Sequence, residues 1–60
     1  MNKNFEHRIR VENYKREYSD WCREHLDNEE WYMKIAFLGP TATYFFEREE
    51  YLTAFKLAVL

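Results

Sequence analysis

The sequence predicts an α+β fold, in which a long N-terminal amphipathic helix packs on an antiparallel β-hairpin that is followed by a short C-terminal helix. Apolar residues recur at helical spacing from about Ile9 to Leu26. Gly39 and Pro40 separate two strand-like runs, and acidic residues precede an apolar run at the C-terminus. The chain contains no linker, repeat or low-complexity segment, so we expect residues 1–60 to form a single small domain.

The first predicted element is an amphipathic helix of roughly four to five turns, from about Ile9 to Leu26. Its apolar side contains Val11, Tyr14, Tyr18, Trp21, Cys22, His25 and Leu26, and its polar side contains Glu12, Lys15, Arg16, Ser19, Arg23 and Glu24. Asn28 is able to adopt the left-handed conformation that ends many helices. The start is left open between an earlier cap at Asn2 or Asn4 and frayed first residues.

The segment from Trp31 to Glu47 predicts a single β-hairpin whose two-residue turn is Gly39-Pro40. That turn sets the cross-strand pairs on one face as Phe37 with Ala42, Ile35 with Tyr44, Met33 with Phe46 and Trp31 with Arg48. The other face, which includes Phe45, is mixed and suits partial exposure. An isolated two-stranded ribbon is marginal in water, so a helix or a second copy of the chain has to cover the apolar face.

The C-terminal segment predicts a short helix from about Arg48 to Phe55, because Glu49 and Glu50 favour a helix N-terminus. Beyond it, apolar residues alternate with other residues at the period of a strand. The range 56–60 is therefore left open between a last helical turn and a third strand.

The last quarter of the chain resembles the C-terminal part of many short, uncharacterised bacteriophage-encoded proteins. The residues that carry the resemblance are Tyr44-Phe45-Phe46-Glu47, Glu49-Glu50 and Ala54-Phe55-Lys56-Leu57. It implies a strand, an acidic turn, a brief helix and a strand-like ending, together with a phage origin. The chain departs from the pattern in having Ala54 directly before Phe55, and the resemblance implies nothing about functional residues.

Composition sets narrow limits on function. Nine basic and eleven acidic residues nearly balance, so the net charge of −2 does not select a partner. A domain of this size buries only roughly 60% of its unfolded surface, so we expect reinforcement by aromatic packing or by oligomerisation. The first ten residues are too polar for a signal peptide, and no apolar run is long enough to span a bilayer. We expect a cytoplasmic protein, in the host cell if it is phage-encoded, with no membrane partner.

Catalytic and metal-binding motifs are weak. Cys22 and His25 stand three residues apart on the predicted helix, but a zinc site needs further ligands. We interpret Cys22 as a buried core residue and His25 as a helix-end residue. The chain offers no nucleophile with its base and is too small for a typical ligand pocket, so we expect no enzyme activity, no cofactor and no metal.

Three carboxylates precede the first strand of the predicted hairpin and three follow the second. The predicted pairing of Trp31 with Arg48 places both sets at the same end, and aromatic residues lie beside them. This combination of negative charge and amphipathic rings is typical of an interface for a basic surface. The predicted partner-binding residues are Asp27, Glu29, Glu30, Trp31, Tyr32, Glu47, Glu49, Glu50 and Tyr51. We expect a protein–protein interaction module, a phage accessory protein that inhibits or redirects a host protein.

Self-association and nucleic-acid binding are the two further expectations. We expect a homodimer that forms through Phe45, Phe55, Leu57, Val59 and Leu60. The alternative function is a small nucleic-acid-binding protein that uses a basic N-terminal helix carrying Lys3, His7, Arg8, Arg10, Lys15 and Arg16. Interleaved glutamates make that alternative the weaker one.

Overall fold

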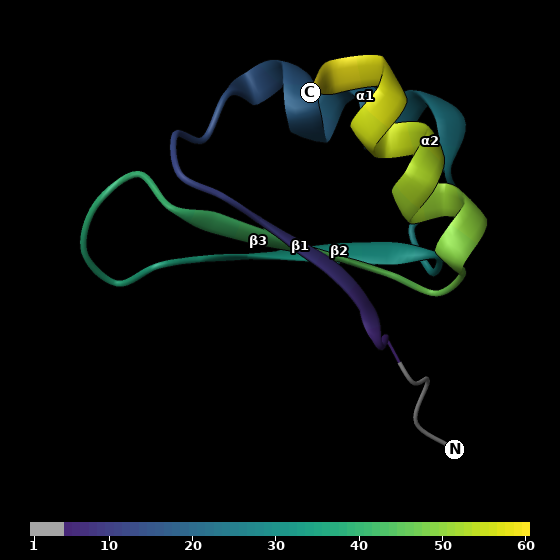
Figure 1. Cartoon of the computed structure of the whole chain (residues 1–60), viewed down its shortest axis with the longest axis horizontal. Coiled ribbons are helices and arrows are strands. Elements are labelled where there is room, and N and C mark those ends of the chain that lie inside the picture. Colours follow the sequence, from purple (N-terminus) through teal and green to yellow (C-terminus); the bar gives the residue numbers. More distant parts are fainter. Residues whose placement is uncertain (1–4) are drawn as a thin grey trace.

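The computed structural model describes residues 5–60 and confirms the α+β class. Its elements follow in the order β1 (His7–Val11), α1 (Arg16–His25), β2 (Trp31–Ile35), β3 (Ala42–Phe46) and α2 (Glu49–Val59). The three strands form one antiparallel sheet in the order β1-β3-β2, so the last strand in sequence is the central one. Both helices lie on the same side of this sheet (Figure 1).

The predicted long N-terminal helix is wrong, because residues His7–Val11 form an edge strand and only Arg16–His25 are helical. Ile9 and Val11 alternate with exposed arginines, and both are β-branched residues, which favour strands. In the sheet Ile9 pairs with Tyr44. The other edge of β3 is taken by β2, so β1 fills the remaining free edge. The proposed caps at residues 2 and 4 lie outside the described residues.

The hairpin exists, but its register differs from the predicted one by two residues. Ile35 pairs with Ala42, and Met33 pairs with Tyr44. The amide of Ala36 donates to the carbonyl of Thr41 at 2.8 Å, so a four-residue loop, 37–40, replaces the predicted two-residue turn. A shift of two residues keeps every side chain on its face of the sheet, so the predicted core face is retained.

Two features favour the four-residue loop between β2 and β3. Gly39 lies at φ 87°, in the region that favours glycine, and no other atom stands within 4 Å of where its Cβ would be. The amide of Tyr14 donates to the carbonyl of Pro40 at 2.8 Å, which ties the loop to the segment before α1. One consequence is that Phe37 and Leu38 lie outside the strands.

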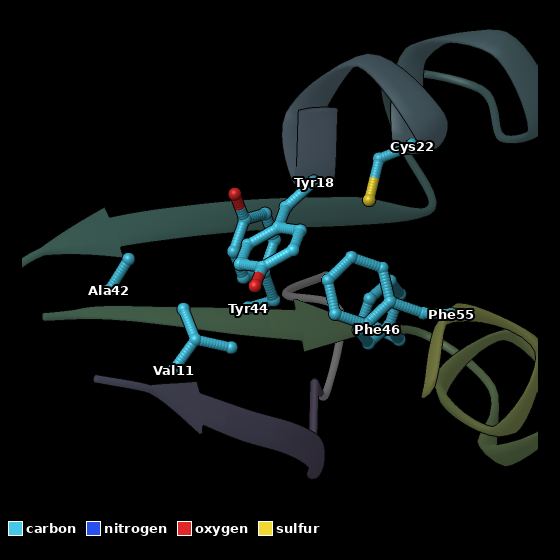
Figure 2. Close-up of a cluster of buried hydrophobic side chains, with 7 residues drawn as sticks. All are labelled: Val11, Tyr18, Cys22, Ala42, Tyr44, Phe46 and Phe55. Atoms are coloured by element: carbon cyan, nitrogen blue, oxygen red, sulfur yellow. The ribbon is translucent and has the colours of Figure 1, made fainter. Parts of the chain in front are cut away.

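The core lies between the sheet and the two helices, and in it Phe55 of α2 lies next to Phe46 of β3 (Figure 2). Its ring centroid is 4.9 Å from that of Tyr44, 5.3 Å from that of Phe46 and 5.8 Å from that of Trp21. Phe55 is fully buried, so it offers no exposed surface for the contact with a second copy that the sequence predicts. A third strand at the C-terminus is also excluded, since α2 continues to Val59.

Candidate partner-binding surfaces

The predicted carboxylates do lie at one end of the hairpin. We call this group the acidic end; it comprises Asp27, Glu29, Glu30, Glu47, Glu49 and Glu50. Antiparallel pairing brings the loop before β2 next to the turn after β3, and the amide of Glu47 donates to the carbonyl of Glu30 at 2.9 Å. The predicted pairing of Trp31 with Arg48 is wrong, because Trp31 pairs with Phe46.

Glu30 serves the fold as well as the acidic end. Its Oε2 accepts a hydrogen bond from the Tyr51 hydroxyl at 2.7 Å, and its Oε1 accepts one from the amide of Asp27 at 2.9 Å. The hydrogen bond to the Glu30 carboxylate raises the pKa of Tyr51, because the phenol has to keep its proton to donate. Glu30 therefore joins the loop before β2 to the first turn of α2.

Two shallow hollows flank the start of α2, and Glu49 and Glu50 line both of them. The first has a volume of about 430 Å³ and is lined by His7, Glu47, Arg48, Glu49 and Glu50. The second has a volume of about 450 Å³ and is lined by Glu49, Glu50, Thr53, Ala54 and Leu57. A charged hollow thus adjoins a more apolar one across a shared pair of carboxylates.

The aromatic residues predicted for the acidic end are divided between the two faces of the sheet. Trp31 is half-buried on the core face, where its ring stacks on Tyr44 with centroids 6.2 Å apart. Tyr32 lies on the opposite face and stacks on Phe45 with centroids 4.5 Å apart. Tyr51 is half-buried beside Glu30. Of the three, Trp31 and Tyr51 lie at the acidic end and Tyr32 faces away from the helices.

The remaining residues predicted for self-association differ in exposure. Leu57 is 83% exposed and Leu60 is 58% exposed, while Val59 is half-buried against the core. Phe45 is half-buried on the face of the sheet that the helices leave open. Leu57 and Leu60 are therefore the exposed members of this set.

Cys22 and His25 do not form a reactive pair. Cys22 is fully buried, and burial raises the pKa of its thiol to about 12, so the thiol stays protonated at neutral pH. His25 is exposed, stacks on Trp21 with ring centroids 4.7 Å apart, and has its Nδ1 3.0 Å from the Trp21 carbonyl oxygen. Within residues 5–60, no three His, Cys, Asp or Glu side chains are placed to hold a metal ion.

The sequence reasoning missed two exposed apolar residues and one residue that lines the charged hollow. Phe37 is 99% exposed and Leu38 is 81% exposed at the tip of the hairpin loop, because the true register removes both from the strands. His7 lines the charged hollow because it lies beside Phe46 in the sheet. Only the position of β1 in the sheet places His7 at this hollow, and the predicted helix for that segment did not.

The basic residues assigned to an N-terminal helix are divided among three places. Arg8 and Arg10 are on β1, Lys15 and Arg16 are at the start of α1, and residue 3 lies outside the described residues. A nucleic-acid surface on a basic N-terminal helix is therefore wrong for this fold.

Comparisons with protein-family models, with curated proteins and with solved structures find no match. Neither α1 nor α2 is long and apolar enough to cross a lipid bilayer.

Proposed function

We propose that this protein is an interaction module that binds another protein through its acidic end. The proposed partner has a basic surface, and in a phage-infected cell it is a host protein that the module inhibits or redirects. The observation that carries the proposal is the pair of hollows that share Glu49 and Glu50. A partner segment that carries a basic side chain next to an apolar one matches both hollows, with the basic side chain in the charged hollow and the apolar side chain in the other.

The physical roles of the two hollows are different. Exposed ion pairs contribute roughly 0–1 kcal/mol each, so charge at Glu49 and Glu50 mainly steers and orients a partner. Burial of an exposed side chain such as Leu57 contributes about 1.5–3 kcal/mol, which exceeds what either carboxylate adds. Binding of this kind is expected to depend on both the carboxylates and the apolar hollow.

The test is capture of partners from host lysate by the immobilised protein, followed by mass spectrometry. The variant Glu49→Lys with Glu50→Lys should lose the partner that the wild-type protein retains. A matched control, Glu12→Lys with Glu17→Lys, makes the same change in net charge at exposed positions after β1 and in the first turn of α1, away from the acidic end. An unchanged set of captured proteins in the first variant, with an unchanged circular dichroism spectrum, would remove the acidic end from consideration.

Homodimerisation is a second part of the proposal. Leu57 and Leu60 expose apolar surface along one side of α2, and β1 and β2 are both edge strands of the sheet. A small domain with exposed leucines and open sheet edges gains stability when a second copy covers them.

A further inference from the structure

One face of the sheet is left open by both helices (Figure 1). Two cross-strand rows occupy the middle of this face, and we call their residues the open face. The strand register places Arg8, Phe45 and Tyr32 in one row and Arg10, Thr43 and Lys34 in the next. These rows alternate with the residues that point into the core, because neighbouring residues of a strand face opposite sides.

The aromatic part of the open face is held in a fixed arrangement. The rings of Tyr32 and Phe45 are nearly parallel, at 7°, with centroids 4.5 Å apart. Phe5 packs against Tyr32 edge to face, with centroids 5.0 Å apart. Tyr32 nevertheless remains 38% exposed. Tyr32 and Phe45 cover one face of each other, and the outer ring surface that remains exposed is already packed in place, which lowers the cost of ordering it on binding.

The charged part of the open face is basic. Arg8, Arg10 and Lys34 are all exposed, and the Nζ of Lys34 lies 6.0 Å from the centroid of the Phe45 ring. Arg8 and Arg10 form no ion pair with any residue in the range 5–60. The carboxylates that belong to this face lie beyond the two rows.

Those carboxylates limit the length of the basic surface. Glu30 and Glu47 are adjacent at one end, as their backbone hydrogen bond of 2.9 Å shows. Glu6 precedes β1 at that same end, and Glu12 follows the last residue of β1 at the other. Between these ends the two rows carry three cations and no carboxylate. A polyanion is attracted to the middle of the face and repelled from both ends.

We propose that the open face binds a short stretch of single-stranded nucleic acid. Arg8, Arg10 and Lys34 contact phosphates, and a base packs on the rings of Tyr32 and Phe45. Cationic side chains beside aromatic rings are the combination by which proteins hold single strands without reading their sequence. Neighbouring strands lie about 4.8 Å apart, so a three-stranded face is about 10 Å wide and accommodates only a few nucleotides.

Other occupants of the open face fit the charges less well. A second copy packed face to face would bring the arginines of one chain towards the arginines and lysine of the other. A basic protein segment, which suits the acidic end, would be repelled here. A duplex has its bases stacked inside and gives the exposed rings nothing to stack on, so it gains only the phosphate contacts.

The salt dependence of binding follows from the number of cations that contact phosphates. Three phosphate contacts on a single strand predict a slope of about −2 for log K against log salt, at about −0.7 per contact. Removal of two of the cations should reduce the slope to about −0.7. Loss of one stacked base should lower the affinity by roughly 5- to 150-fold and leave the slope unchanged.

The experiment is a fluorescence-anisotropy titration of the full chain with a labelled ten-residue oligodeoxythymidine at several salt concentrations. Arg8→Gln with Lys34→Gln should weaken binding at low salt by at least tenfold and flatten the salt dependence. The matched control is Arg16→Gln with Arg23→Gln, which removes the same charge from exposed positions on α1. Tyr32→Leu tests stacking, and thermal melts monitored by circular dichroism confirm that each variant folds.

The outcomes are distinct from those of the lysate experiment. Weaker binding by the open-face variants, with the α1 control unchanged and Glu49→Lys with Glu50→Lys still binding, supports the proposal. Absence of binding by the wild-type protein at low salt overturns it. Equal loss in the α1 control, or equal affinity for a duplex of the same length, also overturns it, because either result reduces the interaction to unspecific charge attraction.

Discussion

The hydroxyl of Ser19, at the middle of α1, lies 2.9 Å from the hydroxyl of Tyr44, at the middle of β3. Both residues are fully buried. The Ser19 hydroxyl is also 3.3 Å from the Tyr14 hydroxyl and donates to the sulfur of Met33 at 3.7 Å. Ser19 therefore joins the first helix to the central strand by polar contacts within an otherwise apolar core.

Replacement of Ser19 should destabilise the protein more than its small volume indicates. In Ser19→Ala the buried Tyr44 hydroxyl loses its closest partner, which costs about 1–3 kcal/mol of unfolding free energy. Urea denaturation measures this loss, and Thr53→Ala, at an exposed position on α2, serves as the control. Tyr44→Phe combined with Ser19→Ala should cost less than the sum of the two single changes. Strict additivity would show that the two hydroxyls do not interact.

The register of the hairpin can be tested by two phenylalanines. Phe37 is 99% exposed and Phe46 is fully buried. Phe37→Ala should change the unfolding free energy by less than ~0.5 kcal/mol, whereas Phe46→Ala should cost ~3–5 kcal/mol. A large loss in Phe37→Ala would favour the alternative register, in which Phe37 lies opposite Ala42 on the core face.

A second test of the register uses a charged side chain. Ile35 is 58% exposed near the end of β2, so Ile35→Asp should leave a cooperative unfolding transition. Tyr44→Asp should abolish folding, because it places a carboxylate in the centre of the core. Thermal melts followed by circular dichroism distinguish the two. Unfolding of Ile35→Asp would mean that the end of β2 is covered in solution.

Stability should fall in alkali. Burial raises the pKa of the Cys22 thiol from 9.0 to about 12, and burial raises the pKa of the Tyr44 hydroxyl from 10.0 to about 12. The unfolded chain therefore loses both protons at lower pH than the folded protein, and the unfolded state is favoured as pH rises. The decline starts near pH 9 for Cys22 and near pH 10 for Tyr44, at up to ~1.4 kcal/mol per pH unit for each group.

Denaturant titrations at a series of pH values measure this decline. Cys22→Ala should remove the part of the loss that begins near pH 9, and Tyr44→Phe should remove the part that begins near pH 10. Stability that stays constant between pH 8 and pH 11 in the wild-type protein would contradict the assignment of both groups.

Self-association should depend on the exposed side chains of Leu57 and Leu60 at the C-terminal end of α2. Sedimentation at micromolar concentration should show a dimer for the wild-type chain, and Leu57→Ser with Leu60→Ser should shift it to the monomer of 7.5 kDa. Leu38→Ser is the control, because Leu38 is similarly exposed, at 81%, but lies at the tip of the hairpin loop. A wild-type monomer under these conditions would remove the dimer from the proposal.

The sequence was a good guide to which faces are buried and a poor guide to pairing over long distances. Alternation along the hairpin correctly placed Tyr44 and Phe46 in the core, because a slip of two residues leaves the alternation unchanged. For the same reason the pattern could not distinguish the true register from the one with a two-residue turn. Because Phe37 and Leu38 are apolar, the sequence favoured the two-residue turn, in which both residues belong to a paired strand.

The N-terminal strand was missed because two periodicities overlap there. Ile9 and Val11 alternate as in a strand, but they also continue the helical spacing of Tyr14 and Tyr18. What decides between them is the free edge of β3, which lies more than thirty residues away in sequence. Ser19 was assigned to the polar side of the helix, although its hydroxyl faces the core to meet Tyr44.

The order β1-β3-β2 also has a consequence for how the protein is made. Both β1 and β2 pair only with β3, which ends at Phe46, so no part of this sheet can assemble until β3 has left the ribosome. Until then both outer strands lack their only neighbour, and α1 has no surface to rest on. We therefore expect the sheet to form in one step once β3 is available, and nascent chains to be open to proteases and chaperones until then.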